Sequence, residues 1–221
     1  MFRLLPSLLC GLLATAAATH AAPLIGIMEG ESYVSPTGQF RIRTPVLPEL
    51  GGSITDTPNV VTFQDNFGTH VSVACFEFDA TQRWEYDTRG RRDYLLYFLT
   101  DVVMANFQQR FPGSRVESAR YLPALREGAL IGYSLLPGGS EFEQATRVLN
   151  GPPADPVTAK RGTLLFVHNR YVYAISAELA ERATQRTTYR LTREQEDEQL
   201  AARLTGILER MSFTSERSFT P

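Results

Sequence analysis

Residues 163–176 read Thr163-Leu-Leu-Phe-Val167, then His168-Asn169, then Arg170-Tyr-Val-Tyr-Ala-Ile-Ser176. Both runs are rich in residues that favour strands, and Asn tolerates the positive φ of a tight turn, so the stretch predicts a β-hairpin turning at His168-Asn169. If Val167 pairs with Arg170, both faces are apolar. One carries Leu164, Phe166, Tyr171, Tyr173 and Ile175, and the other carries Leu165, Val172 and Ala174. We therefore expect this part of the sheet to be covered on both sides.

A helix is expected shortly after the hairpin, over residues 193–211. Thr192-Arg-Glu-Gln195 has the pattern of a capping box, in which the Thr hydroxyl and the Gln side chain satisfy free backbone N–H groups. An apolar stripe follows at helical spacing, with Glu196, Asp197, Arg203 and Arg210 expected off it; its members are Leu200, Leu204, Ile207, Leu208 and Met211. We expect this helix to pack on the sheet. The early Glu194, Glu196, Asp197 and Glu198 suit the helix dipole and require no ligand.

The remaining pattern predicts strands at 40–43, 59–64, 69–78, 115–121, 128–136 and 142–149, with a turn at 65–68 and loops at 46–57, 84–90 and 151–160. A second helix is expected over residues 94–110, capped by Asp93 and ended by Pro112-Gly113. The predicted fold class is α+β, with an antiparallel sheet of six to eight strands covered by two main helices. Because the 94–110 helix is apolar almost all round, we expect it in the core. A homodimer interface between Tyr94 and Phe111 is the alternative.

Two short motifs near the start of the predicted domain resemble a known family. Gly38-x-Phe-Arg-Ile-x-x-Pro45 precedes Val61-x-Phe63-x-Asp65-Asn66-Phe67 and a β run. This arrangement resembles the opening of PsbP-like (Mog1/PsbP) domains. The resemblance implies an α/β/α sandwich built on an antiparallel sheet, and a binding or assembly role rather than catalysis.

The first 21 residues have the pattern of a secretory signal peptide. Arg3 precedes an uncharged run from Leu4 to Ala18, and small residues follow it. We expect cleavage after Ala21, with Ala18 as the alternative, and hence a periplasmic or secreted protein. Cys10 lies inside the apolar run after two leucines, which argues against a lipoprotein. We then expect a flexible N-terminus at 22–32, a single domain at 33–213 and a tail at 214–221.

Composition argues against a nucleic-acid partner and a membrane span. The chain has 22 basic and 24 acidic residues, a balance that argues against nucleic-acid binding. After the predicted signal peptide, no stretch approaches the ~20 uncharged apolar residues that span a bilayer. The only cysteine outside that peptide is Cys75, so we expect no intramolecular disulfide.

No motif predicts a catalytic, cofactor or metal site. Gly132-Tyr-Ser134-Leu-Leu136 has Leu where a nucleophile elbow needs Gly, and it lies in a predicted strand. His70 and His168 lie at or near predicted turns, where histidines are ordinarily solvated. Cys75 lies in an alternating apolar strand, which is typical of a small buried hydrophobe, and it shares no zinc-ligand spacing with the histidines.

A basic cluster is the one candidate binding site in the sequence. Arg89, Arg91 and Arg92 come just before the 94–110 helix, where free N–H groups and the helix dipole add to a positive field. An anion or acidic partner could bind there, and a solvated basic face is the ordinary alternative.

These observations favour an exported, non-enzymatic domain that binds a protein or cell-envelope partner. The alternative is a small hydrolase whose site is assembled from Ser, Tyr and carboxylate side chains that sequence spacing does not reveal. Convergence of Ser134 with His70 or His168 and an acid would favour the hydrolase.

Overall fold

The computed structural model describes residues 23–143 and 156–214. Its main sheet is antiparallel and seven-stranded, in the order β4-β5-β6-β10-β9-β8-β7. The strands are β4 (Ser53–Asp56), β5 (Val60–Gln64), β6 (His70–Glu77), β7 (Arg115–Leu122), β8 (Ala129–Pro137), β9 (Thr158–His168) and β10 (Tyr171–Glu178). A smaller antiparallel sheet has the order β1-β2-β3-β11 and consists of β1 (Ile27–Glu29), β2 (Ser32–Val34), β3 (Phe40–Arg43) and β11 (Met211–Phe213).

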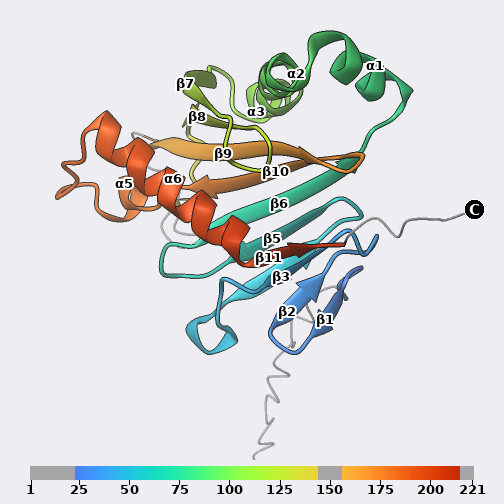
Figure 1. Cartoon of the computed structure of the whole chain (residues 1–221). Helices are drawn as coiled ribbons and strands as arrows, with labels where there is room; N and C mark the ends of the chain where they lie inside the picture. Colours follow the sequence, from blue (N-terminus) through green and yellow to red (C-terminus); the bar gives the residue numbers. More distant parts are fainter. Residues whose placement is uncertain (1–22, 144–155, 215–221) are drawn as a thin grey trace, which may run out of the picture.

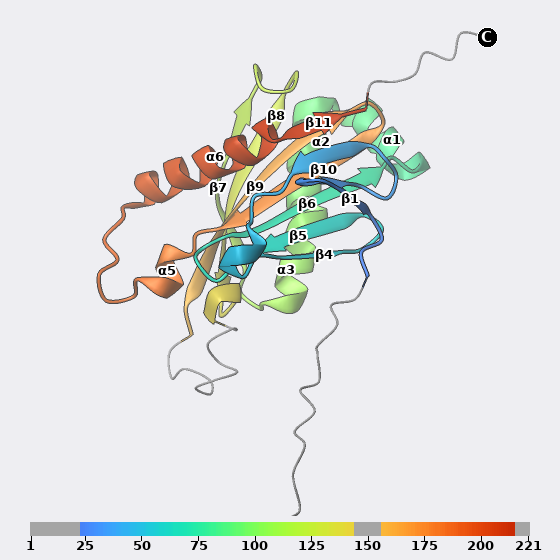
Figure 2. The ribbon, with the colours of Figure 1, turned by 90° about the horizontal axis from the view of Figure 1, so that it is seen from below.

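Helices lie on both faces of the main sheet. One face is covered by α1 (Ala80–Arg89), α2 (Arg91–Tyr97), the π-helical segment η2 (Phe98–Val103) and α3 (Met104–Arg110). The other is covered by α6 (Arg193–Glu209) and the smaller sheet, as Figures 1 and 2 show from two directions. Two short helices are η1 (Pro48–Leu50) and α5 (Glu181–Thr184). The α+β sandwich and its strand number are therefore as predicted, except that strands share one outer layer with α6.

The β9–β10 hairpin has the predicted faces but not the predicted turn. His168 pairs with Tyr171, so the two turn residues are Asn169 and Arg170 rather than His168 and Asn169. Asn169 takes the positive φ, 54°, that tight turns require and that Asn tolerates. The observed register differs by two residues from the predicted pairing of Val167 with Arg170. Side chains alternate between the two faces with a period of two, so this shift leaves every side chain on its predicted face.

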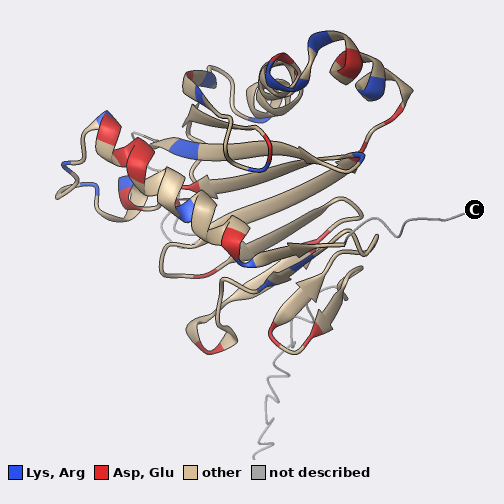
Figure 3. Cartoon of the chain, viewed as in Figure 1, with Lys and Arg blue, Asp and Glu red and all other residues tan. Residues whose placement is uncertain are grey.

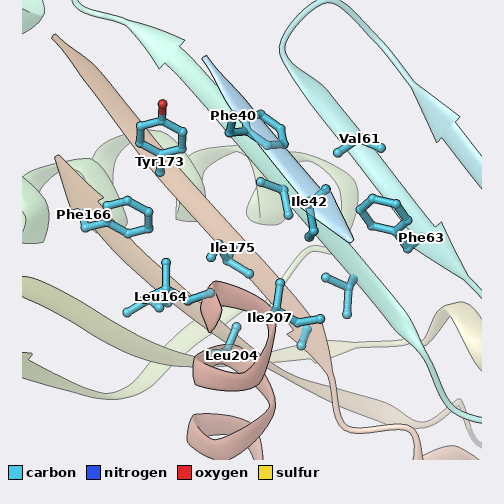
Figure 4. Close-up of a cluster of buried hydrophobic side chains, with 14 of the residues drawn as sticks. Phe40, Ile42, Val61, Phe63, Leu164, Phe166, Tyr173, Ile175, Leu204 and Ile207 are labelled. Carbon is cyan, nitrogen blue, oxygen red and sulfur yellow. The ribbon is translucent and has the colours of Figure 1, made fainter. Parts of the chain in front are cut away.

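Each face of this hairpin is buried by different elements. Leu165, Val167 and Val172 pack with residues of α2 and η2, including Tyr94, Leu95, Phe98 and Leu99. Leu164, Phe166, Tyr173 and Ile175 pack with Leu204 and Ile207 of α6 and with Phe40 and Ile42 of β3 (Figure 4). The rings of Phe166 and Tyr173 stack at 5.0 Å between centroids. The expectation that both faces are covered is confirmed.

Several local predictions are wrong. Residues 84–89 belong to α1, not to a linker; no residue of that helix is fully buried, so no apolar stripe marks it in the sequence. Strands β4 and the start of β9 occupy segments predicted as loops, and β1 lies within the segment expected to be a flexible N-terminus. These strands or strand ends are too short, or too polar, for alternation to show. The strand predicted at 142–149 is contradicted at Phe142 and Glu143, which are helical; residues 144–149 lie outside the described part of the chain. So do the predicted signal peptide and residues 215–221 of the tail.

A buried ion network joins α6 to the sheet. Glu196, predicted to lie off the apolar stripe, is 2% exposed, because Lys160 of β9 points at it from beneath. The Lys160 ammonium is fully buried and lies 2.7 Å from Glu117, 3.0 Å from Glu196 and 2.5 Å from Asp197. Figure 3 shows the acidic first turns of α6 beside the basic band on β9.

Two further side chains complete the network around Glu196. Arg182 of α5 binds both carboxylate oxygens, at 2.6 and 3.0 Å, and the Tyr189 hydroxyl donates to one of them. Burial alone would raise the pKa of Glu196, but hydrogen bonds from Arg182, Tyr189 and Lys160 outweigh it and hold the pKa below its ordinary value. The network therefore fixes α5 and the first half of α6 relative to β7 and β9.

Substitution on each face of β9 tests the double burial. Leu164→Ala and Leu165→Ala each remove a fully buried side chain, from opposite faces, and we expect each to lower the free energy of unfolding by about 2–5 kcal/mol. Urea denaturation measures both. If one face were open to solvent, its variant would stay within about 0.5 kcal/mol of the wild type.

The ion network is tested by Lys160→Met, which leaves three carboxylates without their shared cation. We expect a loss of about 3–5 kcal/mol in the free energy of unfolding. Arg170→Met is the matched control, because Arg170 pairs with Glu77 at 3.6 Å on the surface and should cost less than about 1 kcal/mol. Equal losses in the two variants would contradict a structural role for the buried network.

Candidate functional site

A groove lies between α5, the second half of α6 and the turn that joins β5 to β6. Its volume is about 490 Å³ and it is open to solvent along one side. The elements that line it, α5, α6 and the β5–β6 turn, lie toward the left of the molecule in Figure 1. We call it the α5–α6 groove; its lining residues are Pro45, Phe67, Gly68, Thr69, Val71, Ala180, Glu181, Thr184, Gln185, Arg203, Gly206, Ile207 and Arg210.

The β5–β6 turn holds an aromatic ring at the edge of this groove. One Asp65 carboxylate oxygen accepts hydrogen bonds from the backbone N–H groups of Phe67, Gly68 and Thr69, at 2.8–2.9 Å. Burial opposes ionisation of Asp65, but these N–H groups outweigh it and lower its pKa. Gly68 has φ of 136°, which disfavours any other residue. The turn predicted at 65–68 is confirmed, and it leaves Phe67 74% exposed.

A second loop brings more apolar surface beside Phe67. Leu47 and Leu50 follow Pro45 and are both about half exposed. Gly51 ends this loop in the left-handed conformation, and a Cβ there would lie 2.7 Å from the Asn66 side chain. The loop therefore lies against the β5–β6 turn. Exposed apolar side chains gathered in one region are typical of an interaction surface.

The α6 wall of the groove is apolar at the base and basic at the rim. Ile207 is buried below, whereas a Cβ added to Gly206 would meet no atom within 4 Å. Arg203 pairs with Glu181 and donates to the Glu178 carbonyl, and the exposed Arg210 donates to the Thr44 carbonyl at 3.4 Å. An apolar base inside a polar rim is the usual anatomy of a protein-binding surface.

The predicted arginine cluster lies in the other layer, around α1 and α2. Arg89 pairs with Glu85 and lies 4.6 Å over the Tyr97 ring, and Arg91 donates to the Tyr86 hydroxyl and the Arg126 carbonyl, both at 3.1 Å. Arg92 is exposed. Two of the three guanidinium groups thus already bind other parts of the chain. An anion or partner site at this cluster stays a prediction.

Ser134 and the histidines do not converge. Ser134 is fully buried in β8, and its hydroxyl lies 3.2 Å from the Met104 sulfur. His70 lies three strands away on β6, roughly 14 Å at the ~4.8 Å spacing of neighbouring strands. His168 lies at the end of β9 with its ring 5.1 Å from the Phe213 ring. Cys75 is a buried free thiol whose pKa burial raises to about 11, which makes it a poor nucleophile.

Among residues 23–143 and 156–214, no group of three or more His, Cys, Asp and Glu side chains is arranged to hold a metal ion. No helix in the same ranges is long and apolar enough to cross a membrane.

No protein-family model matches the sequence, and no curated protein matches it. The solution structure of cyanobacterial PsbP from Synechocystis matches with a TM-score of 0.50 and 12% identity, covering 89% of this chain and 99% of that one. The fold is PsbP-like.

Other solved structures match less closely in shape. The Saccharomyces cerevisiae Ran-binding protein Mog1p has a TM-score of 0.48 and 10% identity, covering 85% of this chain and 96% of its own. A Bacteroides thetaiotaomicron protein has a TM-score of 0.44 and 9% identity, and this chain spans 50% of its length. At such identities, likeness to the PsbP-like fold concerns architecture alone.

Sequence reasoning missed the groove on this PsbP-like fold. Phe67 belongs to the motif that indicated the family, but the motif did not show that its ring is exposed. The available signal was chemical: an aromatic residue stands between Asn66 and Gly68, where turns ordinarily carry polar residues. Arg203 and Gly206 line the same groove as Phe67 only because of how α6 packs, which local sequence does not encode.

His70 gives a pH-dependent prediction. Burial, and then the nearby Arg161 cation, lower its pKa to about 4, against ~6.5 in an unfolded chain. Between these values the unfolded chain binds a proton that the folded chain does not, so the free energy of unfolding falls as the pH drops from 6.5 to 4. The pKa difference corresponds to about 3 kcal/mol. Urea denaturation of the wild type and of His70→Gln between pH 6.5 and 4 measures this effect. We expect the free energy of unfolding to fall more steeply with decreasing pH in the wild type. Parallel dependence on pH in the two proteins would contradict the lowered pKa of His70.

Proposed function

We propose that this protein is an exported, non-enzymatic domain that binds a partner protein in the cell envelope through the α5–α6 groove. The observation that carries the binding role is Phe67, a large aromatic side chain held in solvent by a rigid turn at the edge of a groove. Holding such a ring in water is unfavourable unless a partner covers it. Export is supported by the basic, apolar and small-residue order of residues 1–21.

The groove indicates the chemistry of the partner. Val71, Ala180 and Ile207 offer an apolar base, so an inserted aliphatic or aromatic side chain would lie against them and beside Phe67. Arg210 at the rim has an exposed guanidinium and suits a carboxylate. The proposed partner segment therefore carries an apolar anchor with an acidic residue next to it.

The hydrolase alternative has no comparable support. It requires Ser134 to meet a histidine base, and the described part of the chain keeps Ser134 buried and three strands from His70. A nucleophile must be reachable by substrate and within hydrogen-bond reach of its base.

Affinity capture from an envelope extract tests the proposal when wild type and Phe67→Ala are used as parallel baits. We expect a partner to be recovered by the wild type and lost with Phe67→Ala, since truncating a central aromatic typically weakens an interface by 2 kcal/mol or more, about 30-fold.

Gly206→Leu gives a second test, because it fills the groove from α6 without meeting other atoms at its Cβ. Direct titration of the purified partner should then reproduce both losses.

Trp84→Ala is the matched control for this experiment. Trp84 is also an exposed aromatic residue, 62% exposed, but it lies on α1 in the opposite layer. A partner that binds the wild type and Trp84→Ala equally, but not Phe67→Ala, supports the groove. A partner lost only with Trp84→Ala, or recovered equally by all four baits, would refute it.

A further inference from the structure

The strand β7 forms one border of the main sheet. Among the described strands it pairs only with β8, so alternate backbone N–H and C=O groups of β7 point away from the sheet. A bulge between Val116 and Ser118 interrupts its first half, where the Arg193 guanidinium also donates to the Glu117 carbonyl. The edge from Ser118 to Tyr121 is therefore the part that can pair with another strand.

A groove of about 450 Å³ lies between this edge and α6. We call it the β7–α6 groove; its lining residues are Ser118, Ala119, Arg120, Tyr133, Glu194, Asp197, Glu198 and Ala201. The four residues from α6 recur at helical spacing, so a single face of that helix forms one wall. A strand added to β7 would pack against this wall, which is how extended segments bind beside exposed sheet edges.

The floor of the β7–α6 groove holds a polar group without a partner. Tyr133 of β8 is 4% exposed, and no described group hydrogen-bonds to its hydroxyl, although that oxygen is not sealed from solvent. A buried tyrosine hydroxyl ordinarily has a hydrogen-bond partner. The hydroxyl is thus available to a group that enters the groove.

The charges around the groove leave two carboxylates and one guanidinium unpaired. Three cations and three carboxylates pair with one another and cancel: Lys160, Arg182, Arg193, Glu117, Glu196 and Asp197. Glu194 and Glu198 on α6 and Arg120 on β7 are exposed, and none of them forms an ion pair within the described ranges. The α6 wall, part of the acidic start of that helix in Figure 3, therefore lacks a cation.

A second copy of β7 can supply this cation. Residues directly opposite one another in an antiparallel pair lie on the same face, so two β7 strands related by a two-fold axis are centred on a residue. Ser118 and Arg120 lie on the face covered by α6, because their β8 partners belong to the core beneath that helix. Centring on Ala119 places Arg120 of each copy opposite Ser118 of the other. Centring on Arg120 would place two guanidinium groups opposite each other, which is unfavourable.

We propose that the protein forms a symmetric homodimer through antiparallel pairing of its β7 strands, with Arg120 of each copy bound in the β7–α6 groove of the other. The guanidinium then meets Glu194 and Glu198 and lies beside the Tyr133 ring and hydroxyl, all of which favour a cation. Ala119 at the centre is small and exposed, so the strands can approach. Pairing covers both β7 edges and closes the assembly at two chains.

Sedimentation equilibrium of the protein purified after expression of the full chain tests this proposal. We expect the wild type to pass from the mass of one chain to the mass of two at micromolar concentrations. Arg120→Glu should weaken the dimer about 100-fold or more, because like charges then meet at two places. Glu194→Arg/Glu198→Arg should weaken it similarly. An equimolar mixture of these two variants should restore the mass of two chains, because opposite charges meet again at both places.

Arg43→Glu is the matched control, because Arg43 is an exposed strand arginine in the smaller sheet. This variant and Phe67→Ala in the α5–α6 groove should dimerise like the wild type, and the urea midpoint of each variant shows whether it is folded.

Two results with the charge variants overturn the proposal. One is a wild type that keeps the mass of one chain at the highest concentration, which would leave the β7 edge to a strand of another protein. The other is a mixture of the two charge variants that stays monomeric. A dimer that survives Arg120→Glu but is lost with Leu96→Glu overturns it too, because Leu96 is exposed on α2 and the interface would lie there.

Discussion

Burial of both faces of the β9–β10 hairpin is the constraint on which the rest of the structure depends. Adjacent residues such as Leu164 and Leu165 point in opposite directions and are both inaccessible to water, so the sheet must have a layer on each side. The helices α1–α3 form one layer. The other layer consists of α6 and the smaller sheet. Its two parts are continuous in the chain, because β11 of the smaller sheet begins at Met211, directly after α6.

Charge burial gives this second layer a fixed position. Apolar contacts alone would tolerate some sliding of α6 over the sheet, whereas Lys160 and Arg182 must meet the Glu196 carboxylate with defined geometry. Because α6 also forms one wall of the α5–α6 groove, the network helps to set the shape of that groove. Lys160, the only lysine of the chain, therefore helps to hold α6 in the position that shapes the α5–α6 groove. The groove offers an apolar base, an exposed aromatic ring and basic groups, which are features of protein recognition.

The sequence by itself determined the fold class, most strands of the main sheet, the capping box of α6, the turn at Asp65 and the apolar faces of the hairpin. These follow from periodicity and turn chemistry, which act between residues close in the chain. It did not determine α1, the short strands, or the burial of Glu196, whose partners Lys160 and Arg182 are 36 and 14 residues away. Tertiary structure also decided the groove, because Phe67 and Gly206 line it together only after distant segments pack. Local pattern shows which side chains favour burial, but packing in three dimensions decides which polar and aromatic groups are left to bind something else.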